Sequence, residues 1–137
     1  MASPTAFDAI HDYLAAAWTG TPIVFENEPW PLPNDPAAFV FVEIVSSVYD
    51  QASIGGGDQR SDNLWRENGV VYGHVLTPSG TGSRPARVLA QQFIDLLRGQ
   101  EIGPITFQGA SIGAGMPGDQ DGNYYRQTAT VDWQRDE

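Results

Sequence analysis

One five-residue pattern in this chain has the spacing of a nucleophilic site. Residues Gly109 to Gly113 spell G-x-S-x-G, the sharp turn that presents a reactive serine in α/β-hydrolases. That chemistry needs a helix directly after the serine, and an acid followed by a histidine later in the chain. The only histidines, His11 and His74, both precede Ser111. The sequence therefore predicts a glycine-rich loop between strands here, and no catalytic serine.

A second pattern overlaps the first and has the spacing of a dinucleotide-binding turn. Residues Gly113 to Gly118 spell G-x-G-x-x-G, which binds a pyrophosphate only between a strand and a helix. Pro117 and the acidic turn after it exclude that helix. A P-loop is excluded as well, because its lysine is missing and the chain contains no lysine. No nucleotide cofactor is expected.

Acidic residues and histidines could bind metal or transfer protons, but their spacing does not favour either. In the calcium loop of EF-hands, glycine is sixth and a bidentate glutamate twelfth. Counted from Asp119, Gly122 is fourth and Thr130 twelfth, so a turn is expected. Neither His11 nor His74 has a second histidine at helical spacing or an acid placed to form a triad. We expect structural roles for both, with no metal site and no catalytic residue.

Composition narrows the class of protein further. A chain of 137 residues with 41% apolar residues predicts one globular domain, residues 1–137. It contains no cysteine, which excludes disulfides and thiolate metal sites. The net charge is −10, and all seven basic residues are arginines, so tight binding to DNA or to an anionic membrane is not expected. We expect a protein made in the cytoplasm, without a membrane segment.

The periodicity predicts two helices and five strands. One helix begins after Ser3-Pro4 and ends at Gly20, and a second begins near Ser83 and ends at Gly99. The strands are expected at 23–25, 39–45, 65–76, 105–107 and 124–133, with a polar loop over 46–63. The order α-β-β-β-α-β-β predicts an α+β two-layer sandwich, in which two helices pack on an antiparallel or mixed sheet.

The apolar residues predict which faces are buried. In the first helix, we expect the stripe Phe7, Ile10, Leu14, Ala17 and Trp18 to face the sheet. In the second helix, we expect Val88, Leu89, Phe93, Leu96 and Leu97 to do so. The nearly continuous apolar run over 39–45 predicts a central strand that is covered on both sides.

Two loops stand out by composition. Four prolines occur within 27–36, around Trp30, and three consecutive glycines open the long polar loop 55–63. These segments are either ordinary surface loops or contact regions that a neighbouring subunit orders. The residues expected at a subunit or tube interface are Trp30, Gly55, Gly56, Gly57, Arg60, Trp65 and Arg66.

Several landmarks together resemble the tail terminator proteins of long-tailed bacteriophages and phage-derived particles. They are the segment Gln51 to Gly57, the run Val75 to Gly82, the helix that ends at Gly99, Ser111-Ile112-Gly113 and the closing Val131-Asp132-Trp133-Gln134. The similarity covers roughly Ala37 to the end of the sequence, and the first helix and short strand fit the family order.

The resemblance implies a structural protein of the virion tail at the head–tail junction, without enzymatic activity or cofactor. Such proteins form a ring, typically a hexamer, that binds the last ring of the tail tube protein and stops its polymerisation. The other face of the ring binds a head-completion or stopper protein, and genome DNA passes through without specific binding. Two alternatives remain open, namely a head–tail connector or stopper protein, and a small-ligand-binding or enzymatic α+β domain.

Overall fold

The computed structural model describes residues 3–29, 36–51, 65–117 and 122–136. It confirms the predicted α+β fold and element order, and it adds two strands of two residues each, β4 and β6. The elements are α1 (Pro4–Ala17), β1 (Ile23–Phe25), β2 (Phe39–Gln51), β3 (Trp65–Pro78), α2 (Arg84–Leu97), β4 (Glu101–Ile102), β5 (Ile105–Ile112), β6 (Met116–Pro117) and β7 (Tyr124–Asp136).

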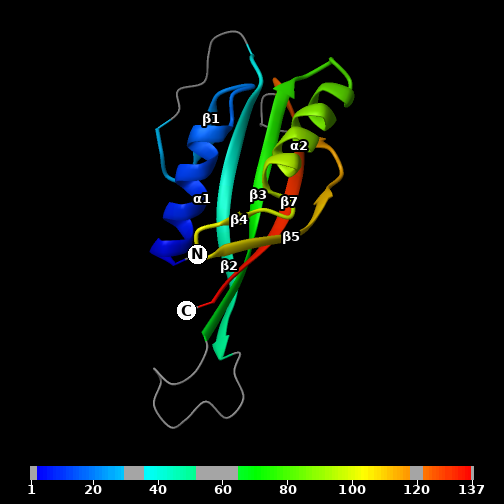
Figure 1. Cartoon of the computed structure of the whole chain (residues 1–137). Coiled ribbons are helices and arrows are strands. Elements are labelled where there is room, and N and C mark those ends of the chain that lie inside the picture. Colours follow the sequence, from blue (N-terminus) through cyan, green and yellow to red (C-terminus); the bar gives the residue numbers. More distant parts are fainter. Residues whose placement is uncertain (1–2, 30–35, 52–64, 118–121, 137) are drawn as a thin grey trace.

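The strands form one mixed sheet that carries both helices on the same face (Figure 1). The strand order is β1-β2-β3-β7-β5-β4, and β6 pairs with β7. Only the β1–β2 pair is parallel. We call the side under the helices the helix face and the other side the open face. Successive residues of each long strand therefore point alternately to the helix face, where the helices cover them, and to the open face.

Helix α1 begins and packs as the sequence predicts. The Ser3 side chain accepts a hydrogen bond from the Ala6 N–H at 3.3 Å, and Pro4 occupies the first turn, where it has no amide to leave unpaired. Ile10, Leu14 and Trp18 are buried against the sheet. The apolar stripe therefore fixes which side of α1 faces the core.

Helix α2 packs through a slightly different stripe from the predicted one. Phe93 and Leu97 are buried as expected, together with smaller residues of the same face such as Ala90. The expectation for Val88 is wrong, because its side chain is 42% exposed. Val88 is two residues from each of the buried Ala86 and Ala90, which places it roughly 200° around the helix from them, on the solvent side.

Two glycines of β3 leave room for large aromatic side chains on the helix face. A Cβ atom at Gly69 would lie 2.3 Å from the ring of Trp133, and one at Gly73 would lie 2.7 Å from the ring of Phe93. Both rings are buried, and burying a side chain of this size contributes about 2–3 kcal/mol. The two glycines thus stabilise the core because the missing side chains leave space for the rings of Trp133 and Phe93.

The prediction that β2 is covered on both sides is only half right. Val40, Val42 and Ile44 lie in the core on the helix face. On the open face no helix of the described residues covers the strand. Instead, Phe39 joins a small second cluster, and Phe41 packs against that cluster while staying half-buried. The apolar run in the sequence thus serves one main core and one minor cluster.

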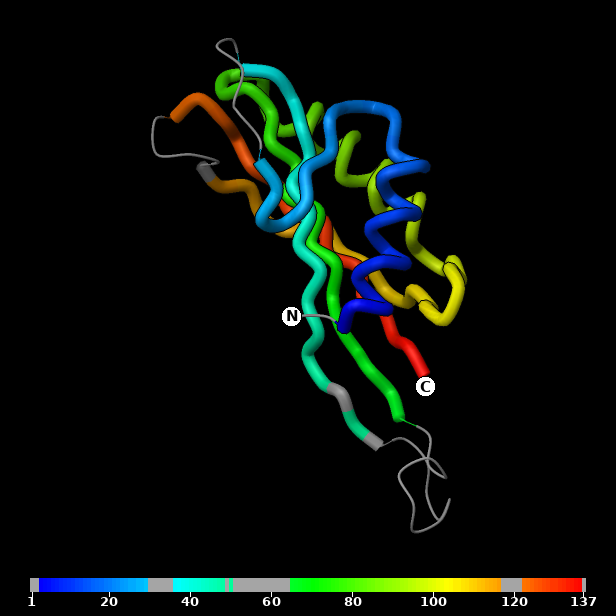
Figure 2. The backbone as a smooth tube through the Cα atoms, turned by 90° about the vertical axis from the view of Figure 1, so that its left-hand side faces the viewer, coloured from blue at the N-terminus to red at the C-terminus, as the bar shows by residue number. Residues whose placement is uncertain are grey.

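The segment 46–51, predicted as part of a loop, is strand. β2 continues to Gln51, which pairs with Trp65 of β3, and a bulge between Ser46 and Val48 interrupts the register. In Figures 1 and 2 this β2–β3 hairpin extends well beyond both helices. This part of β2 does not pack against the core, so its residues are mostly polar. The alternation of apolar and polar residues that is typical of a half-buried strand is therefore missing.

Candidate functional site

Two of the seven predicted interface residues lie on the projecting hairpin. Trp65 opens β3 opposite Gln51, and Arg66 follows it. Trp30, Gly55 to Gly57 and Arg60 lie outside the described residues. Whether the seven residues form one surface therefore stays a prediction, and the described part places Trp65 and Arg66 at the outer end of the paired strands β2 and β3.

Arg66 makes an ion pair with an acid of its own chain. Its guanidinium donates to the carboxylate of Asp136 at 2.7 and 3.0 Å in a two-point contact. The two side chains are 36% and 39% exposed. Hydrogen bonding to Arg66 lowers the pKa of Asp136. An acid on a neighbouring subunit, the partner expected from the sequence, would have to compete with this internal pair.

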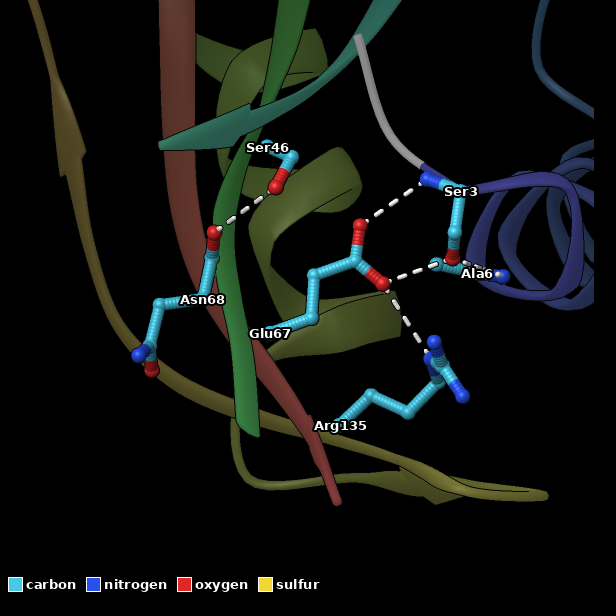
Figure 3. Close-up of polar contacts among 6 residues, drawn as sticks. All are labelled: Ser3, Ala6, Ser46, Glu67, Asn68 and Arg135. Atoms are coloured by element: carbon cyan, nitrogen blue, oxygen red, sulfur yellow. Dashed lines mark hydrogen bonds and ion pairs between the residues drawn. The ribbon is translucent and has the colours of Figure 1, made fainter. Parts of the chain in front are cut away.

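Directly beside this pair, a buried polar cluster ties helix α1 to the end of the sheet (Figure 3). The carboxylate of Glu67 accepts hydrogen bonds from the Ser3 N–H at 2.9 Å and the Ser3 hydroxyl at 2.6 Å. It also accepts one from Arg135 Nε at 3.2 Å. Glu67 is 1% exposed and Arg135 is 7% exposed. The cluster positions the first turn of α1 over the outer end of β3.

The contacts of Glu67 determine its ionisation. Burial raises the pKa of this carboxyl group, but the hydrogen bonds from Ser3 and the charge and hydrogen bond of Arg135 outweigh burial. The pKa of Glu67 therefore lies below that of an ordinary glutamate. Sequence reasoning did not single out Glu67, although an acid and an arginine at buried positions of two long strands were a usable signal.

A second polar cluster lies on the open face of the sheet and corrects the expectation for His74. An acid does lie next to this histidine: Glu43 Oε1 is 2.5 Å from His74 Nε2. On the other side of the ring, His74 Nδ1 is 2.7 Å from the Thr128 hydroxyl. The ring also stacks between Phe41 and Tyr72, with centroids 6.0 Å apart in each case.

Carboxylate, imidazole and hydroxyl in this order are the components of a catalytic triad. A nucleophilic hydroxyl also needs an oxyanion hole, built from N–H donors that are free beside it. Thr128 lies within β7, between β3 and β5, and its carbonyl accepts a hydrogen bond from Gly113 N–H at 2.8 Å. These neighbours favour an orienting role, in which Glu43 and Thr128 fix the orientation of the imidazole ring.

A hollow of about 250 Å³ opens beside His74 on the same face. Phe39, Phe41 and Leu76 provide apolar walls, while Glu43, His74 and Arg126 line it with polar atoms. No local sequence pattern predicts this site, because its residues come from three strands whose register brings them together.

The expectation of a loop around Ser111 is wrong, because β5 is longer than the predicted strand 105–107 and continues to Ile112. Ser111 lies in β5 opposite Thr130, and the short strand β6 follows where a nucleophile elbow or dinucleotide site would need a helix. In the parts of the chain that the structure describes, no three acids or histidines are grouped closely enough to hold a metal ion. No described helix has the length and apolar character needed to cross a bilayer.

Comparison with known proteins gives information on the fold. No protein-family model matches the chain, and no curated protein is similar to it in sequence. Sixteen chains of solved structures are similar to it. One of them is 18% identical and has a TM-score of 0.56, and the match covers 95% of this chain and 89% of that chain. At this level of identity the likeness concerns the fold alone.

Proposed function

We propose that this chain is a ring-forming tail terminator that caps the tail tube of a phage or phage-derived particle. The observation that carries the proposal is the β2–β3 hairpin, which extends beyond the two-layer body (Figure 2). A projecting hairpin exposes backbone and side chains that a monomer has no need to present. In a closed ring, each subunit instead needs an element that reaches its neighbour.

The surface of the hairpin suits contact with another protein. Beyond the bulge of β2, Ser47 and Asp50 are exposed, and Val48 is 49% exposed. One apolar side chain among polar ones is typical of a wet, non-obligate interface. Contacts of this kind are weak in solution and become stable when several form at once. The proposal therefore has the isolated chain monomeric and the ring assembled on the end of the tube.

The charge of the chain fits a ring through which DNA passes. A net charge of −10 repels phosphate and leaves no large reserve of cations to retain a duplex. The proposed partners are copies of this chain in a hexamer, the tail tube protein on one face and a head-completion or stopper protein on the other. The proposed location is the head–tail junction of the virion.

The test is deletion of the gene in the producing particle, followed by measurement of tail length by electron microscopy. Loss of a terminator leaves tails longer than normal, because tube polymerisation is no longer stopped. Loss of a connector or stopper leaves tails of normal length that lack heads. Tails of normal length that are joined to heads would refute both assignments.

A variant test addresses the hairpin itself. Replacing Arg60 and Arg66 together by alanine is expected to weaken binding to purified tube ends, while unfolding of the monomer changes little. Exposed ion pairs such as Arg66–Asp136 contribute only about 0–1 kcal/mol. Arg98→Ala is the matched control, because it removes an exposed arginine that pairs with Asp95 at 3.6 Å on α2. If the control weakens tube binding equally, the hairpin is not the contact.

A further inference from the structure

We propose that the hollow on the open face is a binding site for a carboxylate group with an apolar body, and that Arg126 recognises the carboxylate. The site lies away from the projecting end of the β2–β3 hairpin, and the proposal does not depend on the terminator assignment. The ligand chemistry is a small monocarboxylate, supplied either by a free molecule or by a carboxyl group of another chain.

Arg126 is the observation that points to a ligand. Within the described residues, the one hydrogen bond of its side chain goes from Nη2 to the sulfur of Met116, and a thioether is a weak acceptor. Its Nε is buried and has no hydrogen-bond partner there. A buried N–H without an acceptor is unfavourable, and the half-buried guanidinium has no oxygen acceptor among the described residues. A carboxylate on the guanidinium would supply the missing negative charge.

The neighbouring basic group cannot take this role. Both ring nitrogens of His74 are already engaged, with Glu43 and with Thr128. The imidazole therefore presents its ring and no free N–H to the hollow. Arg126 is the one permanent cation among the residues that line the site.

The register places the acid of the site away from the arginine. Arg126 pairs with Leu76, which pairs with Phe39, whereas Glu43 pairs with Tyr72 four residues further along the sheet. From strand geometry, the Cα atoms of Glu43 and Arg126 are roughly 16 Å apart. The carboxylate of Glu43 is held at His74 Nε2, so it does not pair with Arg126.

The size and walls of the hollow define the rest of the ligand. Most small-molecule sites have volumes of about 300–1,000 Å³, and this hollow of about 250 Å³ accommodates one ring or a short alkyl group. Phe39, Phe41 and Leu76 would contact that group. A ligand of the size and chemistry of 3-phenylpropionate would place its ring on these walls and its carboxylate at Arg126.

The experiment titrates 3-phenylpropionate into the full chain and follows backbone amide shifts by NMR, with 3-phenylpropanamide as the uncharged probe. We expect saturable shifts in β2, β3 and β7 around the hollow, and an affinity for the carboxylate about tenfold above that for the amide. Arg126→Gln should abolish this preference, and the matched exposed variant Arg98→Gln should keep it. Equal binding of both probes, an unchanged preference in Arg126→Gln, or the absence of localised shifts would overturn the proposal.

Two further measurements complete the test. Arg126→Gln should leave the thermal midpoint of the free chain unchanged or raised, since it removes a poorly satisfied cation. A large loss of stability would show that Arg126 serves the fold, and would overturn the proposal.

Sedimentation distinguishes the two sources of the carboxylate, a free molecule and another copy of the chain. If another copy supplies the carboxylate, the probe and Arg126→Gln both reduce self-association, whereas a free molecule leaves sedimentation unchanged. Either sedimentation result supports the site, provided that the NMR titration shows the preference for the carboxylate over the amide.

Discussion

Replacement of Glu67 by alanine is expected to destabilise the protein more than any substitution of an exposed charge. The change removes the carboxylate that accepts hydrogen bonds from Ser3 and from the buried Arg135. Removing one partner of a buried ion pair costs about 3–5 kcal/mol, because the remaining charge is still held out of water. The cluster lies at the end of the sheet, so we expect the lower limit, about 3 kcal/mol. For a domain of this size, that corresponds to a fall of roughly 10 °C in Tm.

Urea unfolding followed by circular dichroism measures this loss directly. Asp136→Asn is the matched control, since it breaks the neighbouring cross-strand pair with Arg66, which is exposed, and should cost no more than about 1 kcal/mol. If Glu67→Ala and Asp136→Asn destabilise equally, or if Glu67→Ala costs less than 1 kcal/mol, burial does not determine the strength of these pairs and the reasoning fails.

The pKa of Glu67 gives the same prediction a pH dependence. Because this pKa is lower in the folded protein than in an ordinary glutamate, ionised Glu67 stabilises the fold above the unfolded-state pKa of about 4.3. That contribution is lost as pH falls below this value toward the lower folded-state pKa. The stability difference between the wild type and Glu67→Ala should therefore be constant near neutral pH and shrink in acid. A difference that grows in acid would contradict the assigned contacts.

Three other predictions follow from packing and charge. Gly69→Ala should destabilise the protein by at least about 2 kcal/mol, because its Cβ would lie 2.2 Å from the Val45 carbonyl oxygen. The control is Gly109→Ala, which should be neutral in the same urea assay because a Cβ at this position would lie in open space. Val88→Glu should change stability by less than about 0.5 kcal/mol, since the side chain is largely exposed. The free chain should show no mobility shift with duplex DNA near physiological salt, and a salt-sensitive shift that disappears when the arginines in the first turn of α2 are removed would contradict this.

The sequence was sufficient to predict the elements that bury a regular stripe. Helix α1 was found because its N-cap, its first-turn proline and its apolar spacing all indicate the same helix. Strand β7 was found because Ala129, Val131 and Trp133, which are buried, alternate with polar residues. The outer part of β2, from Ser46 to Gln51, was missed because strands that leave the core have no apolar alternation to mark them.

The polar sites depend on strand register, which the sequence does not specify locally. Glu43 and His74 are far apart in the chain and meet because Phe41 lies opposite His74 in the sheet. A slip of one residue would move His74 to the helix face. The sequence therefore did not reveal Glu43 as the acid next to His74. The hollow lined by Arg126 depends on the register of β7 in the same way.

The two cross-strand ion pairs explain how the hairpin can project without separating from the sheet. Arg66 and Glu67 are consecutive in β3, so their side chains leave opposite faces of the sheet. Arg66 pairs with Asp136 on the open face, and Glu67 pairs with Arg135 under helix α1. The outer end of β3 is thus held on both faces at the last residues where β3 and β7 pair. If the hairpin is the arm that reaches a neighbouring subunit, these pairs fix its direction before assembly, and less conformational entropy is lost when the ring closes.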